Sequence, residues 1–317
     1  MNYHILNKLS YREAVAELQT AVSKLNIYGQ RDVLKRFILF SANLQYFMPG
    51  LSSHRHESYF RSLCLQQHVA HLDQSHPQAL DGQKIEGLDA LRKDILSPGP
   101  GIICTYHTGS YRLINRLLMQ KQIPFALLVA REVLVDEELL YRRLFRQLCP
   151  QATNDNFQLI DAQEPSALLK LLRLLDKGIK LLLYVDGNTG IGDTLNRRNS
   201  CEVDFFAKKM AVRKGAGLLS YLSGYPVFPL LCKRTAKGAL AFEVKQLVLP
   251  DKALPRTDFE RSMVQQLYAH LEGSLYENPA EWEGWLHVHR YVKGVGNETI
   301  VLPERLLKIV QEEKLIV

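Results

Sequence analysis

One histidine stands where a short apolar run meets a turn. His107 follows IICTY at 102–106 and precedes Thr-Gly-Ser-Tyr-Arg, after which we expect a helix. An imidazole at the end of a strand, beside the amides of a following helix start, is placed for general-base work in a cleft. A surface or capping histidine is the alternative on position alone. His107 is therefore the first candidate for chemistry.

Two further polar residues follow other apolar runs. Arg131 comes after FALLVA at 125–130, and Asp186 comes after KLLLYV at 180–185. In parallel sheets, reactive groups gather just beyond the carboxyl ends of the strands, so we expect both residues at the same edge as His107. The arginine offers fixed donors for a phosphate or carboxylate.

A glycine-rich stretch, Gly-Asn-Thr-Gly-Ile-Gly at 187–192, follows the aspartate. Glycine allows the backbone to approach an anionic group closely, whereas an ordinary turn is the alternative. The spacing is not GxGxxG, so a dinucleotide site is not indicated. We predict a substrate-binding set that comprises Ser110, Arg131, Gly187, Asn188 and Thr189.

Other reactive side chains are weaker candidates. Cys104 lies on the opposite face of its strand from the histidine three residues later, so we interpret it as a core residue rather than a nucleophile. His287 and His289 could share a face, but no third ligand accompanies them, and we expect no metal. Trp282 and Trp285 are predicted to pack the tail against the core.

The composition is that of a globular protein with a full core, because 46% of the 317 residues are hydrophobic and 23% are charged. The net charge of +7 fits an anionic partner: a phosphopantetheine group, an acidic carrier protein or a membrane surface. The basic residues form no run interleaved with aromatics, so we expect no nucleic-acid binding. Five widely spaced cysteines without a CxxC pair indicate neither a disulfide framework nor a zinc site.

Residues 1–75 are predicted to form a helical segment. Ser10-Tyr-Arg-Glu13 is a capping box that starts a helix, and further helices are expected around 32–47 and 57–72. The longest uncharged stretch, from Phe37 to about Ser53, is too short and too polar to span a membrane. The N-terminus has no signal-peptide pattern. We expect a soluble cytoplasmic protein, with peripheral contact at the inner membrane left open.

After about Gly99 the pattern becomes strand, helix, strand. Strands are expected at 102–106, 125–130, 157–160, 180–185 and 226–231, and helices at 110–120, 137–148, 166–176 and 214–222. The run at 239–247 is expected to be a further, antiparallel strand. This rhythm predicts an α/β fold with a mostly parallel mixed sheet covered by helices. The domains expected are the helical segment, 1–75, and an α/β domain, 76–317.

Four blocks occur in series along the second part of the chain. They are His107-Thr-Gly-Ser-Tyr-Arg112, LLVARE with Arg131, LLLYVDGN with Asp186 followed by VDFFAKK, and GYPVFPLL with Pro229. In order and spacing they resemble the glycerolipid and lipid A acyltransferase superfamily, most closely its lipid A (lauroyl/myristoyl) branch, which has Phe-Phe-Gly where this chain has Phe-Phe-Ala. The tail at 279–293 resembles the ending of that branch, so the resemblance covers roughly residues 90 to 293.

The resemblance implies an enzyme that moves an acyl group from a thioester donor, on an acyl carrier protein or CoA, to a hydroxyl or amine acceptor. His107 would be the general base, without a covalent enzyme intermediate and without a bound cofactor. Arg131 and the glycine-rich stretch would hold the donor's phosphopantetheine or the acceptor's phosphate. Backbone amides and Arg112 would stabilise the oxyanion. An apolar groove between the helical segment and the sheet would hold the acyl chain.

One departure from the family pattern concerns the acid that follows the histidine by five positions, because Arg112 stands there instead. An arginine cannot orient an imidazole as a carboxylate does, and a nearby cation would depress the pKa of His107. Either Asp186 or Glu132 replaces the acid, or the acceptor is an amine that needs little activation. Loss of catalysis, leaving a protein that binds an acyl chain or carrier protein, is the third alternative.

The branch characteristically carries an N-terminal membrane anchor, and we expect none here. This argues against ordinary lipid A maturation and favours a soluble acceptor, such as a carrier-bound or peptide intermediate of a secondary-metabolite pathway.

Overall fold

A computed structural model describes residues 2–81, 84–148, 156–187, 199–235 and 238–292, together with 303, 306–308 and 311. Asn188 and Thr189, both predicted to bind substrate, lie outside these ranges. Among the described residues, no helix is both long and apolar enough to cross a membrane.

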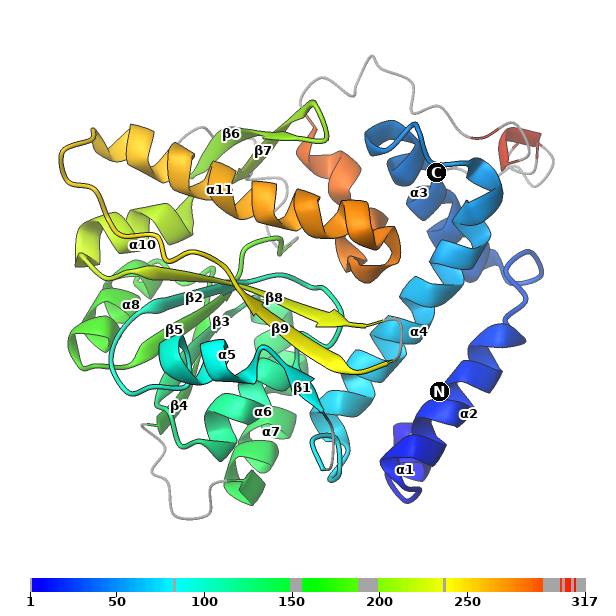
Figure 1. Cartoon of the computed structure of the whole chain (residues 1–317), viewed down its shortest axis with the longest axis horizontal. Helices are drawn as coiled ribbons and strands as arrows, with labels where there is room; N and C mark the ends of the chain where they lie inside the picture. Colours follow the sequence, from blue (N-terminus) through cyan, green and yellow to red (C-terminus); the bar gives the residue numbers. More distant parts are fainter. Residues whose placement is uncertain are drawn as a thin grey trace.

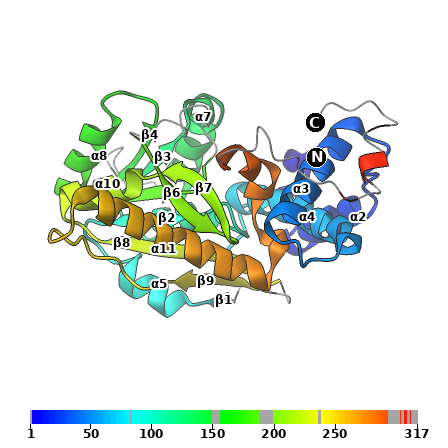
Figure 2. The ribbon, with the colours of Figure 1, turned by 90° about the horizontal axis from the view of Figure 1, so that it is seen from above.

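The N-terminal part of the chain is helical, as predicted. Its elements are α1 (Tyr3–Leu6), α2 (Tyr11–Ser23), α3 (Arg31–Phe47), the short 3-10 helix η1 (Ser53–Arg55) and α4 (His56–Ser75). The predicted capping box is present, because the Ser10 side chain accepts from the Glu13 amide and the Glu13 carboxylate accepts from the Ser10 amide. Figures 1 and 2 show α2, α3 and α4 grouped at one end of the molecule, beside the sheet.

The rest of the chain forms a seven-stranded sheet with the order β1-β9-β8-β2-β5-β3-β4. The strands are β1 (Ile85–Glu86), β2 (Ile102–Thr105), β3 (Phe125–Val129), β4 (Phe157–Asp161), β5 (Lys180–Tyr184), β8 (Val227–Arg234) and β9 (Leu240–Val244). All neighbours are parallel except β8 and β9. The predicted mixed, mostly parallel sheet and the antiparallel strand at 239–247 are confirmed.

Helices cover both faces of this sheet (Figure 1). They are α5 (Leu88–Asp94), α6 (Leu113–Gln120), α7 (Arg131–Leu148), α8 (Ala167–Asp176), α10 (Gly215–Ser223) and α11 (Arg256–Glu277). One hydrophobic core joins α8, α10 and α11 to the sheet, and a second lies under α5, α6 and α7. Phe40 and Phe60 of the N-terminal helices belong to the first core together with Cys104 of β2. The boundary at residue 75 between the two expected domains stays a prediction.

Two element boundaries differ from the prediction for local reasons. The helix expected from Ser110 begins at Leu113, because Gly109 has φ +50° and the residues after it form a turn. The helix expected from Glu137 begins at Arg131, directly after β3, where the Leu134 amide already donates to the Ala130 carbonyl.

Several elements are additional to the prediction, among them β1 and α5. A hairpin of β6 (Ser200–Phe205) and β7 (Lys208–Arg213) forms a separate two-stranded sheet, and α11 packs beside it. The tail then forms three short 3-10 helices, η3 (Pro279–Glu281), η4 (Glu283–Leu286) and η5 (Val288–Tyr291). This tail carries Trp282 and Trp285, which are 1% and 0% exposed and pack against the core as predicted.

Candidate active site

The register of two neighbouring strands brings His107 and Asp186 together. In the parallel pair β2 and β5, Thr105 lies opposite Tyr184, and the Val185 amide extends the ladder by donating to the Thr105 carbonyl. His107 and Asp186 each lie two residues beyond these partners, so they leave the same edge of the sheet at the same height.

The two side chains are hydrogen-bonded. The Asp186 Oδ1 atom lies 2.9 Å from Nδ1 of His107, and its Oδ2 atom accepts from the His107 backbone amide, also at 2.9 Å. The Asp186 side chain is 1% exposed, whereas that of His107 is 28% exposed. A carboxylate only accepts, so Nδ1 carries the proton of the neutral ring and Nε2 presents its lone pair. A carboxylate therefore lies within hydrogen-bond distance of the imidazole, as it must if Asp186 replaces the acid that is missing at position 112.

Opposing effects set the pKa values of the pair. Burial lowers the pKa of His107, but the charge of Asp186 and its hydrogen bond outweigh burial, so this pKa is raised above its usual value. Arg112 lowers the pKa of His107, as expected of a nearby cation. This effect is smaller than that of Asp186, so the prediction that the pKa of His107 would be depressed is wrong. Burial raises the pKa of Asp186, while His107 and the donors around the carboxylate bring it below its usual value.

Two tyrosines fix the plane of the imidazole. Tyr184, the last residue of β5, is stacked on His107 with ring centroids 4.7 Å apart, and Tyr111 meets the ring edge-on at 4.9 Å. Within the described part of the chain, Nε2 of His107 makes no hydrogen bond, and the ring remains partly exposed. The nitrogen that can accept a proton is thus the one that has no hydrogen-bond partner among the described residues.

The turn after His107 is held by the tail. The Gly109 amide donates to the Glu281 carbonyl at 3.1 Å, and the Glu283 amide donates to the His107 carbonyl at 3.1 Å. A side chain at Gly109 would meet the Cys232 carbonyl oxygen at 2.7 Å, in addition to the strain of its φ of +50°. The amides of His107 and Gly109 already have partners, so an oxyanion would need other donors.

Arg112 does not take the position of an orienting acid. Its guanidinium donates to the Gln74 side chain and, at 3.2 Å, to the Tyr111 hydroxyl. Glu132, the other proposed replacement acid, is an exposed residue of the first turn of α7, and His107 makes no contact with it. Of the two candidate acids, the structure places only Asp186 against the histidine.

The residues predicted to bind substrate do not all lie beside His107 and Asp186. Arg131 begins α7 beyond β3, two strands from β2, and its exposed side chain pairs with Asp161 at 2.9 Å. Gly187 follows Asp186, and its carbonyl accepts from the Tyr291 hydroxyl at 2.7 Å. Ser110 is buried, and its hydroxyl has no hydrogen-bond partner among the described residues. Binding of substrate by these residues stays a prediction.

Cys104, His287 and His289, the weaker candidates for chemistry, lie in buried or half-buried environments. Cys104 is completely buried, and burial raises the pKa of its thiol, as expected for a core residue. His289 contacts the side-chain nitrogen of Asn43 at 3.1 Å. Burial lowers the pKa of His287 to about 4 although Asp186 lies nearby. No cluster of three metal-ligating side chains occurs in the part of the chain that the structure describes.

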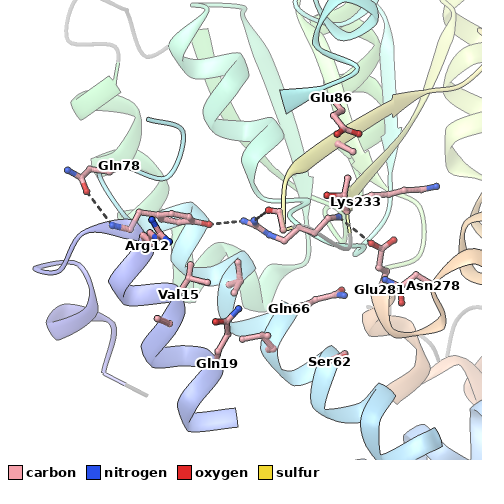
Figure 3. A pocket seen from close by; sticks show the side chains of 18 of the residues that line it. Arg12, Val15, Gln19, Ser62, Gln66, Gln78, Glu86, Lys233, Asn278 and Glu281 are labelled. Carbon is pink, nitrogen blue, oxygen red and sulfur yellow. Dashed lines mark hydrogen bonds between the residues drawn. The ribbon is translucent and has the colours of Figure 1, made fainter. Parts of the chain in front are cut away.

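A groove of about 1600 Å³ lies between the N-terminal helices and the edge of the sheet (Figure 3). Gln19 and Gln66 project into it from α2 and α4, while Lys233 and Glu281 line the opposite side. Lys233 forms an ion pair with Glu277, which also lines the groove, at 3.0 Å. A groove is therefore present between the helices and the sheet, and apolar side chains such as Val15, Leu65 and Val69 line it together with polar and charged ones. His107 is not among the residues that line it. Binding of an acyl chain in this groove stays a prediction.

A histidine and a buried carboxylate at adjacent strand ends of an open α/β sheet form an arrangement that is capable of general acid–base chemistry. The chain matches the family model described as bacterial lipid A biosynthesis acyltransferase over residues 57–291 and belongs to this family. The match includes most of α4 as well as the four sequence blocks and the tail. Membership implies acyl transfer as the class of reaction. No curated protein matches the chain in a sequence comparison.

Sequence reasoning missed the contribution of three aromatic side chains to the site. Tyr111 and Tyr184 contact the imidazole, and Trp282 donates from Nε1 to the Asp186 carboxylate at 2.7 Å. Tyr184 is two residues before Asp186, so its place at the strand end was a usable signal. Trp282 is 96 residues away from Asp186, and only folding brings the two together.

Proposed function

We propose that this protein transfers an acyl group from a thioester donor, carried by an acyl carrier protein or CoA, to a hydroxyl or amine acceptor. His107 is the general base, and Asp186 orients its ring and stabilises the imidazolium. The observation that carries the proposal is the 2.9 Å contact between Nδ1 of His107 and Asp186, which leaves Nε2 free to accept a proton. Family membership supports acyl transfer as the reaction.

The transfer proceeds directly from donor to acceptor. His107 Nε2 takes the proton from the acceptor O–H or N–H as the acceptor atom attacks the thioester carbonyl. The tetrahedral intermediate then collapses with cleavage of the C–S bond, and the imidazolium returns the proton to the departing thiolate. The products are the acylated acceptor and the free thiol, and His107 ends in its starting protonation state. No enzyme nucleophile is needed, which agrees with the burial of Cys104.

Asp186 resolves the problem that Arg112 poses. A dyad usually needs a carboxylate to fix the histidine tautomer, and here that carboxylate comes from the adjacent strand end instead of from the same helix turn. We assign Ser110, Arg131 and Gly187 to binding of the donor's phosphopantetheine or the acceptor, and Arg112 to stabilisation of the developing oxyanion. The acceptor is soluble in our proposal, and the reaction takes place in the cytoplasm or at the inner membrane surface.

Release of free thiol measures the proposed reaction. The protein is incubated with lauroyl-CoA or lauroyl-acyl carrier protein and with candidate hydroxyl and amine acceptors. We expect His107→Ala to lower the rate by about 10²- to 10⁴-fold, since this is the contribution of a positioned general base. His54→Ala, which changes an exposed histidine, is the control. Tight binding of the carrier protein without turnover on any donor would show instead that the protein is a binding module.

A further inference from the structure

The buried indole of Trp282 completes the hydrogen bonding of Asp186. Its Nε1 atom donates to Oδ2 at 2.7 Å, whereas His107 occupies Oδ1. Trp282 is 1% exposed and Asp186 is 2% exposed, so water does not substitute for this donor. Each oxygen of the carboxylate therefore has a side-chain N–H donor in a buried setting, where charge-assisted hydrogen bonds are strong.

The backbone around Trp282 also holds the histidine. Trp282 forms an antiparallel bridge with Thr108, and the flanking hydrogen bonds join Gly109 to Glu281 and Glu283 to the His107 carbonyl. The same three tail residues thus fix the position of the His107 backbone and the orientation of the carboxylate that His107 contacts.

The surroundings of the indole restrict its orientation. Its ring centroid lies 5.0 Å from that of Trp285 and 5.5 Å from that of Phe205. Gly284 leaves space for it, because a Cβ atom at this position would meet Cε2 of Trp282 at 2.1 Å. Aromatic packing and a glycine two residues later therefore direct the N–H group at Asp186.

We propose that Trp282 is a positioning residue, which keeps the Asp186 carboxylate in the plane that retains the proton on Nδ1 of His107. This inference rests on the proposed function for its effect on turnover. Trp282 acts through Asp186 and does not contact the reacting atoms. Neutral donors that orient a functional ligand commonly have this supporting role.

Loss of the indole N–H has a defined electrostatic consequence. Oδ2 would keep only the His107 backbone amide, so the carboxylate would be a stronger base and would hold the imidazolium more tightly. The charged groups that act on His107, namely Asp186, Glu283 and Arg112, would be unchanged in number. His287, Tyr111 and Tyr184 also surround the pair. We therefore expect the pKa of His107 to rise and its ring to be held less well.

The test compares Trp282→Phe with the matched control Trp285→Phe. Trp285 is equally buried, but its Nε1 donates to the Pro279 carbonyl and not to the dyad. We expect Trp282→Phe to lower kcat for thiol release from lauroyl-CoA by about tenfold, with an unchanged donor KM, because one hydrogen bond to a charged group is lost. The acid limb of the pH profile and the NMR titration of the His107 imidazole should move to higher pH, whereas the control should resemble the wild type in both.

The same measurements can refute the positioning role of Trp282 or distinguish it from the proposed acyl transfer. Wild-type titration and kcat in Trp282→Phe, or equal changes in both phenylalanine variants, would show that Trp282 has only a packing role. Should Trp282→Phe not fold, β-(3-benzothienyl)alanine at position 282 preserves the ring shape, replaces N–H by sulfur and is measured in the same way. A shifted His107 titration in a protein whose thiol release is insensitive to His107→Ala would support the positioning role and refute the proposed function.

Discussion

In His107, burial and a neighbouring carboxylate act on the same imidazole in opposite directions. Burial favours the neutral ring, and Asp186 favours the imidazolium, which here prevails and raises the pKa. A base with a raised pKa accepts a proton from the acceptor more readily, but a smaller fraction of it is neutral at a given pH. Activity should therefore fall as the pH decreases through a value above the usual 6.5 of histidine.

Asp186→Asn tests the orienting role of the carboxylate. An asparagine of nearly the same shape can still accept from Trp282, but it carries no charge and can present an N–H group to Nδ1, which favours the wrong tautomer of His107. We expect kcat to fall by about 10⁴-fold, the loss seen when a comparable carboxylate is neutralised in serine proteases. Thiol release from lauroyl-CoA measures this effect.

The control for this variant is Asp204→Asn, which changes an exposed aspartate of β6 that pairs with Lys209. We expect its kcat to stay within twofold of the wild type, because exposed ion pairs contribute little. An Asp186→Asn enzyme with nearly full activity would contradict the dyad and favour an acceptor that needs no deprotonation.

At the scale of elements, the turn of the β6–β7 hairpin contains a local strain. Phe206 and Ala207 have φ of +49° and +58°, a region that costs residues with a Cβ atom about 1 to 2 kcal/mol. Phe206 packs on Trp285 with ring centroids 5.9 Å apart, and this contact compensates for its strain. Ala207 occupies the position of the glycine in the related Phe-Phe-Gly segment, so its strain has no compensating aromatic contact.

Ala207→Gly should therefore raise the free energy of unfolding by about 0.5 to 1 kcal/mol, since relief of the left-handed strain exceeds the added entropy of the unfolded glycine. Urea unfolding measures the change. Ala211→Gly, in the extended backbone of β7, is the matched control and should lower stability. Equal destabilisation by both substitutions would show that the turn is not strained.

Element prediction succeeded where the apolar runs are short and bounded, as in β2, β3 and β5. It missed α11, although Phe259, Met263, Leu267 and Leu271 recur at helical spacing and are buried. It also missed the β6–β7 hairpin, whose turn lacks the glycine that normally marks such a turn. These misses matter because α11 and the hairpin pack around the tail that carries Trp282.

At the scale of the whole molecule, buried neutral histidines link stability to pH. His56 is 1% exposed and hydrogen-bonds to the Ser41 hydroxyl, and burial lowers its pKa to about 4. The unfolded chain binds a proton here near pH 6.5, whereas the folded protein does so only near pH 4. Stability is therefore lost as the pH falls through this window. Burial lowers the pKa of His287 to about 4 as well, so this residue acts in the same direction.

We expect His56→Gln to reduce the loss of unfolding free energy between pH 7 and pH 4 by about 3 kcal/mol relative to the wild type. Urea unfolding at a series of pH values gives the slope, which separates this effect from any uniform destabilisation. His54→Gln, two residues earlier and exposed, should retain the wild-type slope. A wild-type slope in His56→Gln would mean that folding does not change the pKa of His56, which would contradict the role of its burial.

The amino-acid sequence determined the class of fold, the strand ends that carry His107 and Asp186, and the family, because these depend on short patterns within single segments. The sequence also indicated Asp186 and Glu132 as the two candidates for the missing acid, but it could not distinguish between them. The choice depends on the register of β2 with β5, which sets the two side chains at the same height while Glu132 starts a helix beyond β3. The donor from Trp282 required tertiary structure, because a hydrogen bond over 96 residues leaves no trace in local spacing.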